Sequence, residues 1–139
     1  MNFKVIFFYI IFLIPGFAQA NSSCLILFET DKFKQAIEHC SKEATDGNVK
    51  ASEILTQIYS TRGEFLNYAK AFEWAKVASD KGSANSQAVI GLMYLRGDGT
   101  TKNIEKAQYY IQLAIDNGNK GALELRTLMK RAGLWRKST

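Results

Sequence analysis

The chain has 139 residues, of which 47% are hydrophobic, and a formal net charge of +5. A chain of this length forms a single domain with enough residues for a hydrophobic core. Its only proline is Pro15, and the absence of proline downstream favours continuous helices joined by glycine turns over a β-sandwich or a barrel.

Residues 1–20 have the three parts of a secretory signal peptide. Lys4 supplies a positive charge, residues 5–14 form an unbroken apolar run, and Ala18 and Ala20 form a small-residue cleavage site. The run is about half of the roughly 20 residues that a membrane-spanning helix needs, and an uncleaved N-terminal anchor is the alternative. We therefore expect an exported bacterial protein, periplasmic or secreted, whose mature chain does not span a membrane.

The N-terminal segment 21–30 precedes the periodic part of the chain. Within it, residues 24–30 (CLILFET) are the one stretch with a trace of strand-like alternation. This stretch holds Cys24, and the other cysteine of the chain is Cys40. Cys40 could serve as a small buried hydrophobe, but disulfides form in exported proteins. We predict a Cys24–Cys40 disulfide that fastens this segment onto the first helix.

Three copies of one pattern follow, at 34–48, 69–83 and 105–119. In each copy an alanine lies eleven residues before a glycine, and the copies begin 35 and then 36 residues apart. The alanines are Ala36, Ala71 and Ala107, and the glycines are Gly47, Gly82 and Gly118. Glycine at this place suits the left-handed residue that ends a helix, so each copy is predicted to be a helix with its C-terminal turn.

A second block follows each glycine, at 51–59, at 86–94 and, more weakly, at 121–129. In the first of these, apolar residues recur at helical spacing from Ala51 to Tyr59. The periodicity predicts an all-α domain over residues 31–132. The predicted helices are 31–46, 48–61, 67–81, 84–95, 103–117 and 120–132. They form hairpins over 48–81 and 84–117, flanked by the half-repeats 31–46 and 120–132.

This unit resembles the Sel1-like repeat, which is related to the tetratricopeptide α-hairpin. The better copy, residues 86–118, carries the family's small and aromatic residues, and the other copy keeps fewer of them. The matching residues are Tyr59, Trp74, Gly91, Tyr94, Gly97 and Gly99, together with the alanines and glycines named above. The resemblance implies a short α-hairpin solenoid that acts as a non-catalytic adaptor for other proteins.

The loop with Gly97 and Gly99 matches neither of two common ligand-binding motifs. Asp98 and Asn103 do not supply the alternating oxygen ligands and closing glutamate of a calcium loop. A P-loop requires Gly-Lys-Ser/Thr, and Lys102 is followed by Asn103. The glycines are therefore predicted to form an inter-helix turn with Asn103 as the next N-cap, and Asp98 is expected to bind no ligand.

No catalytic, metal or cofactor site is predicted. His39 is the single histidine, and its alignment with Trp74 and Tyr110 predicts a partly buried ring on the inner face of the repeat. Zinc would require more ligands at closer spacing than His39 and the two cysteines provide. The alternative is an enzyme of the β-lactamase or penicillin-binding type, as the resemblance implies for exported members with a cysteine pair in each repeat.

In such solenoids the first helices of successive hairpins line a concave face, so the resemblance implies a protein or peptide partner there. The candidate contacts are Glu53 and Gln57 on one helix and Ala88 and Leu92 on the next. The positive charge lies at the other end of the chain. From Lys120 onward there are six basic residues and one acidic residue, including the tail 133–139. This end is expected to make at most a weak contact with an anionic surface, and no nucleic acid is expected as a partner.

Overall fold

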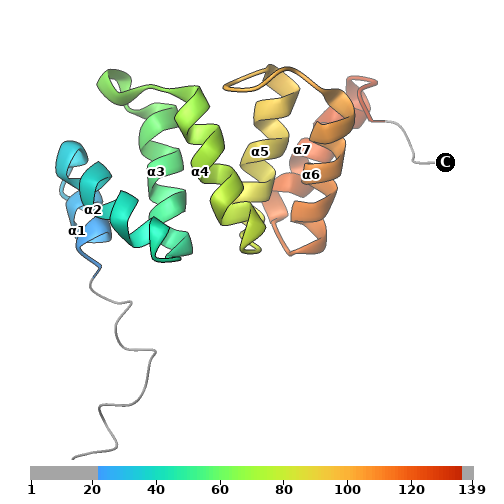
Figure 1. The fold of residues 1–139 in the computed structure, drawn as a ribbon. Helices are drawn as coiled ribbons and strands as arrows, with labels where there is room; N and C mark the ends of the chain where they lie inside the picture. The colour runs from blue at the N-terminus through green and yellow to red at the C-terminus, as the bar shows by residue number, and fades with distance from the viewer. Residues whose placement is uncertain (1–21, 136–139) are drawn as a thin grey trace, which may run out of the picture.

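The computed structural model describes residues 22–135, so the predicted signal peptide and the last four residues of the tail lie outside them. The described part is all-helical, as expected, and contains no strand (Figure 1). Its elements are α1 (Ser23–Glu29), α2 (Phe33–Thr45), α3 (Val49–Thr61), the 3₁₀ turn η2 (Gly63–Phe65), α4 (Tyr68–Asp80), α5 (Ala84–Arg96), α6 (Ile104–Asp116) and α7 (Lys120–Arg131). Between residues 22 and 135, no helix has the length and apolar character needed to cross a bilayer.

Side-chain caps begin six of these helices. At each of them a Ser or Asn oxygen accepts a hydrogen bond from the backbone N–H three residues later. The capping residues are Ser22, Asn48, Asn67, Ser83, Asn103 and Asn119. The cap predicted at Asn103 is therefore present. Helix α2 has Lys32 as its N-cap residue, and this side chain makes no capping hydrogen bond.

The turns after α2, α4 and α6 share one geometry. Gly47, Gly82 and Gly118 have φ values of +101°, +90° and +88°, which strain any residue with a Cβ. In the first turn the N–H of Asn48 donates to the carbonyl of Glu43 at 2.9 Å, and the other two turns repeat this bond. The residue after each glycine is the N-cap of the next helix, so each turn ends one helix and starts another.

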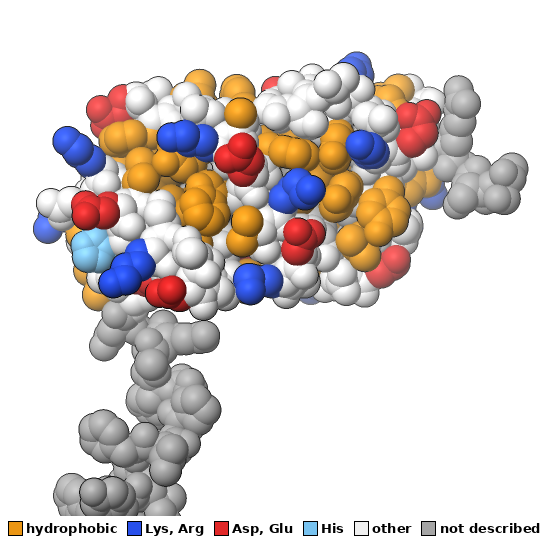
Figure 2. Space-filling model, viewed as in Figure 1, with side chains coloured by type: hydrophobic (Ala, Val, Ile, Leu, Met, Phe, Trp, Pro, Cys, Tyr) orange, Lys and Arg blue, Asp and Glu red, His pale blue; other side chains and the backbone are white. Residues whose placement is uncertain are grey.

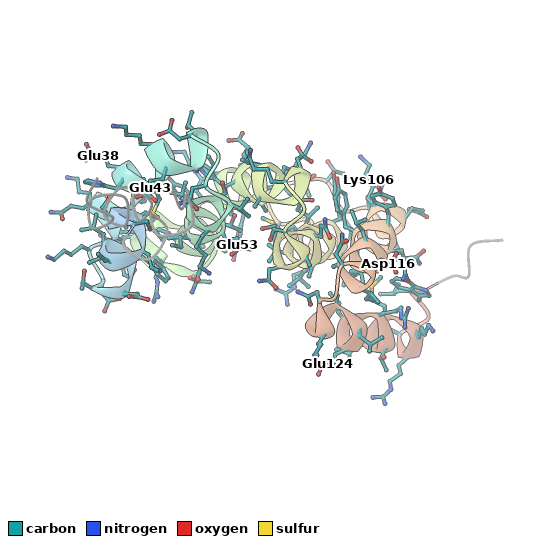
Figure 3. All side chains as sticks on the ribbon, turned by 90° about the horizontal axis from the view of Figure 1, so that it is seen from below. Glu38, Glu43, Glu53, Lys106, Asp116 and Glu124 are labelled. Atoms are coloured by element: carbon teal, nitrogen blue, oxygen red, sulfur yellow. A yellow bond between two sulfur atoms is a disulfide. The ribbon has the colours of Figure 1, made fainter. Side chains whose placement is uncertain are left out.

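The helices form two layers. Seen from below in Figure 3, α3, α5 and α7 lie on one side and α2, α4 and α6 on the other. The closest neighbours are α3 with α4 and α5 with α6. Gly91 allows the second pair to approach, because a Cβ there would lie 2.6 Å from Cγ1 of Ile111. Buried side chains such as Leu55, Ile90 and Ile111 fill the space between the layers.

The expectation of six helices was wrong by one. In the stretch 24–30, where the sequence has a trace of strand-like alternation, residues 24–29 belong instead to the short helix α1, which packs against α2. A seven-residue helix is too short to be stable in isolation, and neighbouring elements hold it in place. Helix α2 is thus not an unpaired half-repeat but the second helix of an N-terminal hairpin.

The weak third copy of the second block is also shifted by one residue from the sequence alignment. Ala122, rather than Gly121, takes the buried place of Ala51 and Ser86, because the N-cap directly after Gly118 sets where α7 begins. In this register Arg126 and Lys130 occupy the positions of Ile90 and Tyr94. On α5 those positions face α6. The equivalent face of α7 is charged, as expected for a helix that caps a solenoid.

Candidate partner-binding groove

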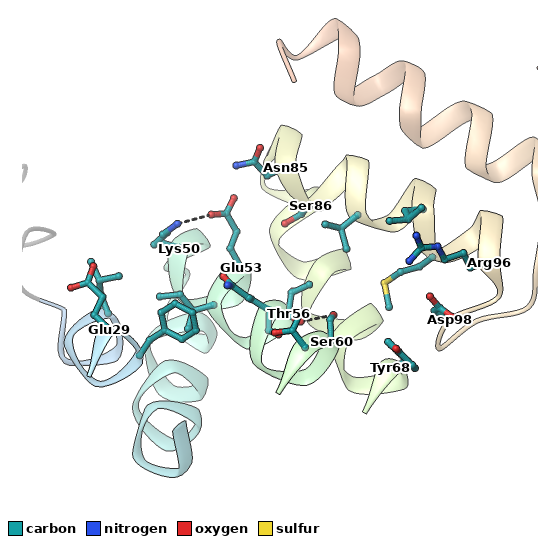
Figure 4. Close-up of a pocket in the computed structure, with 18 residues that line it drawn as sticks. Glu29, Lys50, Glu53, Thr56, Ser60, Tyr68, Asn85, Ser86, Arg96 and Asp98 are labelled. Atoms are coloured by element: carbon teal, nitrogen blue, oxygen red, sulfur yellow. Dashed lines mark hydrogen bonds and ion pairs between the residues drawn. The ribbon is translucent and has the colours of Figure 1, made fainter. Parts of the chain in front are cut away.

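A groove of about 780 Å³ opens on the side of α3 and α5 (Figure 4). Helix α3 lies in the middle, α1 borders it on one side and α5 on the other. Lys50, Glu53 and Asn85 lie toward one end, and Arg96 and Asp98 toward the other. The volume is in the range of pockets that bind ligands in proteins.

The α3 side of the groove is mostly polar. Its lining residues, including Ile54, Gln57, Ser60 and Thr61, recur at spacings of three and four and so share one helix face. The hydroxyl of Ser60 donates to the carbonyl of Thr56 at 2.6 Å, and that of Thr61 donates to the carbonyl of Gln57 at 2.8 Å. Because these protons are used within the helix, both hydroxyls present acceptor lone pairs to the groove.

The α5 side is more apolar at equivalent positions. A step of 35 residues takes Gln57 to Leu92, and both residues line the groove. Val89 and Met93 add further apolar surface on the same side. Helix α7 continues the pattern one repeat later, because Leu128 holds the position of Leu92 and is 58% exposed. The inner face, which is the side of α3, α5 and α7 that lines or continues the groove, thus becomes more apolar from α3 to α7.

Helix α1 borders the N-terminal side of the groove with Leu25, Phe28 and Glu29. The predicted disulfide between Cys24 and Cys40 is present and fully buried, and it ties α1 to α2. A second attachment comes from Glu43 on α2. Its Oε1 accepts a hydrogen bond from the backbone N–H of Cys24 at 3.1 Å and one from the Ser23 hydroxyl at 3.2 Å.

Arg62, at the end of α3, makes a third attachment. Its guanidinium lies 5.8 Å from the ring centre of Phe28 on α1 and 4.6 Å from that of Phe33 on α2. Contacts of this kind contribute about 0.5–1 kcal/mol where solvent is near. The wall of the groove therefore depends on a covalent bond and several weaker contacts.

The groove carries charges of both signs. Its carboxylates are Glu29, Glu53 and Asp98, and its cations are Lys50 and Arg96. Glu53 is held in place, because its Oε1 accepts a hydrogen bond from Ser83 at 2.6 Å and its Oε2 lies 3.4 Å from the Lys50 ammonium. Since Ser83 is the N-cap of α5, this contact also joins neighbouring hairpins.

Three of the four candidate contact residues, Glu53, Gln57 and Leu92, line the groove. Ala88 does not. It is half-buried and packs against the core cluster that contains Ile90 and Ile111. Asp98, expected from the sequence to bind no ligand, is half-buried at the groove's end. The groove residues contributed by α1 were missed, since α1 itself was not predicted.

His39 is exposed, contrary to the predicted inner-face position. Its Nδ1 lies 3.0 Å from the hydroxyl of Ser23, at the start of α1. The equivalent Tyr110 stacks on Tyr94, with ring centres 5.8 Å apart. The short helix α1 offers His39 no such ring, so the partly buried position predicted from the alignment was wrong. His39 does not line the groove.

The two hairpins over α3–α4 and α5–α6 are closed by the same contacts. The Lys70 ammonium lies 5.3 Å from the ring centre of Tyr59, and the Lys106 ammonium lies 5.2 Å from that of Tyr94. The carbonyl of each tyrosine accepts a 2.8 Å hydrogen bond from the N-cap residue of the following helix. The shared tyrosine and lysine of the repeat therefore hold the two helices of a hairpin together.

Gly99 has a steric role in the second of these loops. Its φ is +68°, and a Cβ there would overlap the backbone carbonyl of Tyr68 at the start of α4. The glycine thus lets the loop of the α5–α6 hairpin lie directly against α4 of the preceding hairpin.

The family model for the Sel1 repeat matches residues 59–83 and 84–119. These limits enclose Tyr59, Tyr94, Lys70, Lys106 and Gly99, the residues that close the two hairpins and their second loop. The chain thus carries two Sel1 repeats, which together span residues 59–119. Sel1 repeats generally mediate protein–protein interaction, and the match supports a protein-interaction scaffold role for this chain.

A solved structure has the same fold. It is the crystal structure of a Sel1 repeat protein from Oxalobacter formigenes, which is 24% identical and superposes with a TM-score of 0.72. The match covers 81% of this Sel1-like chain and 47% of the Oxalobacter chain, so this chain spans about half of that protein's length. At this identity the likeness establishes the helical solenoid.

Proposed function

We propose that this Sel1-like protein is an exported, non-catalytic adaptor that holds another protein through the groove beside α3. Leu92 carries the proposal, because it is a large apolar side chain at a groove position where the preceding repeat has the polar Gln57. A leucine facing an open groove gains free energy when a partner covers it.

The disulfide supports the exported part of the proposal. Disulfides persist in oxidising compartments and are rare in the cytosol, and the predicted signal peptide at residues 1–20 indicates the same route. The single histidine lies outside the groove, and no observation on the described residues favours a hydrolytic reaction there. The proposal therefore assigns binding, and no reaction, to the groove.

Site-specific photocrosslinking tests this proposal. A benzophenone side chain would replace Gln57 in the groove and, as a control, Tyr109, which is 63% exposed on α6 in the other layer. Figure 2 shows the face formed by α2, α4 and α6, where hydrophobic and charged side chains are mixed. Irradiation in the native cell envelope fraction should give adducts at position 57 that Leu92→Glu abolishes. Equal adducts at both positions, or adducts that survive Leu92→Glu, would refute the groove as the binding site.

A further inference from the structure

The groove is long enough for a short extended peptide. Its lining runs from Lys50 to Thr61 on α3 and from Asn85 to Arg96 on α5, so the first and last lining residues are eleven positions apart on each helix. At 1.5 Å per residue this is about 16 Å, the length of about five residues in an extended conformation. A helix could also lie along 16 Å, so the chemistry of the walls must decide between them.

An extended peptide and a helix need different walls. A helix satisfies its own backbone N–H and C=O groups, so it suits a groove that is apolar throughout. An extended segment needs partners for its backbone groups along one edge. The α3 side offers such partners. Ser60 and Thr61 present acceptor lone pairs, and the Gln57 side-chain amide has no hydrogen-bond partner within residues 22–135.

The α5 side suits the side chains of the same peptide. Val89, Leu92 and Met93 face the groove there, and Leu25 and Phe28 of α1 add apolar surface across from them. Alternate side chains of an extended segment point to opposite sides, so apolar residues at alternate positions could pack here while the backbone edge faces α3. A helix on this surface would bury the acceptors of α3 without donors, which is unfavourable.

The charges favour a donor-rich ligand. Three carboxylates face two cations in the groove, and Lys50 lies near Glu53 already. Glu29 and Asp98 have no ion-pair partner within the described residues. A lysine or arginine on the ligand would pair with one of them through a charge-assisted hydrogen bond.

We propose that the groove binds an extended peptide segment of about five residues, with apolar side chains at alternate positions and at least one lysine or arginine between them. This inference rests on the proposed adaptor function, because it names the segment that the partner would present.

The probe is a positional-scanning library of acetylated, amidated and fluorescein-labelled hexapeptides, with binding measured by fluorescence anisotropy. The expected consensus alternates apolar and basic residues. Methylating one backbone nitrogen of the best peptide should weaken binding about tenfold at the positions that face α3. Exchanging its basic residue for glutamate should weaken binding by more than tenfold. Affinity that rises when a helix-forming staple is introduced, with no effect of N-methylation, would overturn the extended mode.

Matched protein variants connect the peptide to the groove. Gln57→Leu should weaken binding about fivefold by removing a hydrogen-bonding amide, whereas Gln35→Leu, on the exposed face of α2, should have no effect. Equal effects of the two variants would contradict the inference. If a stapled helical peptide binds and Leu92→Glu abolishes it, the adaptor function stands and the extended mode falls. If Leu92→Glu changes neither peptide binding nor crosslinking at position 57, both proposals fall.

Discussion

Breaking the Cys24–Cys40 disulfide should detach α1 while leaving the rest of the solenoid folded. The helix has seven residues, and helices of this length do not persist alone in water. Without the disulfide, α1 would depend on the hydrogen bonds that it donates to Glu43, the contact with Arg62 and its packed leucine and phenylalanine side chains. In a repeat protein each hairpin contacts only its neighbours, so this loss stays local.

The size of the effect follows from the length of the loop that the disulfide closes. The two cysteines are 16 residues apart, and the chain-entropy relation gives about 3 kcal/mol at 25 °C for such a loop. Opening of α1 becomes easier by that amount when the bond is broken. Because each 1.4 kcal/mol is a factor of ten, hydrogen-exchange protection of α1 should fall by about two orders of magnitude.

Hydrogen exchange read by mass spectrometry measures this directly. Both sulfur atoms are buried, so the protein is reduced in denaturant and refolded with reductant present. Peptides from α1 should lose protection, whereas peptides from α6 in the same sample serve as an internal control. The double variant Cys24→Ala, Cys40→Ala should behave as the reduced protein does. Unchanged protection of α1 after reduction would show that its other contacts suffice and that the reasoning is wrong.

Three further predictions test the turns, the outer layer and the basic end. Gly82→Ala should lower the free energy of unfolding by about 1–2 kcal/mol, because a Cβ there meets open space and only the left-handed backbone is strained. Gly99→Ala should lower it by more, since its Cβ overlaps the carbonyl of Tyr68. Urea unfolding measures both changes in stability, and equal losses of stability in the two variants would contradict the close approach of Gly99 to Tyr68. Burial, followed by the charges of Tyr94, Asp80 and Tyr109, raises the pKa of Tyr110 above 10.0. The free energy of unfolding should therefore be unaffected by this group below pH 10 and fall above it, and Tyr110→Phe should reduce that fall. Lys130→Glu with Arg131→Glu should abolish any sedimentation with phosphatidylserine vesicles at low salt, and binding insensitive to both the variant and salt would disprove the anionic-surface contact.

The sequence predicted the fold well where the repeat is regular. Recurring glycines such as Gly82 and Gly118 marked the helix ends, because a left-handed turn strongly favours glycine. The prediction failed where tertiary contacts or caps determine whether a helix forms and where it begins. Helix α1 is too short to show a helical period, and its existence depends on α2. The shift at Ala122 depends on the N-cap after Gly118, which a comparison of apolar residues alone does not detect.

The candidate site was predictable in part for a related reason. The spacing of 35 residues placed Gln57 and Leu92 on the same face of successive helices, and both line the groove. Ala88 shares that spacing with Glu53, but it packs against the core and does not line the groove. His39 was misplaced because its alignment with Tyr110 assumes an inner helix longer than α1. Periodicity therefore gives the face of a helix, and side-chain length and neighbours determine whether a residue reaches the groove.

The differences between copies locate the binding surface better than their common motif does. Where the repeats agree, as at Tyr59 and Tyr94, the shared residues hold helix pairs together. Where they diverge, as at Gln57, Leu92 and Leu128, the side chains lie on the inner face. A solenoid can change such positions freely, because they bear little of the packing between hairpins. The recurring backbone thus sets the shape of the groove, and the non-recurring side chains determine what it binds.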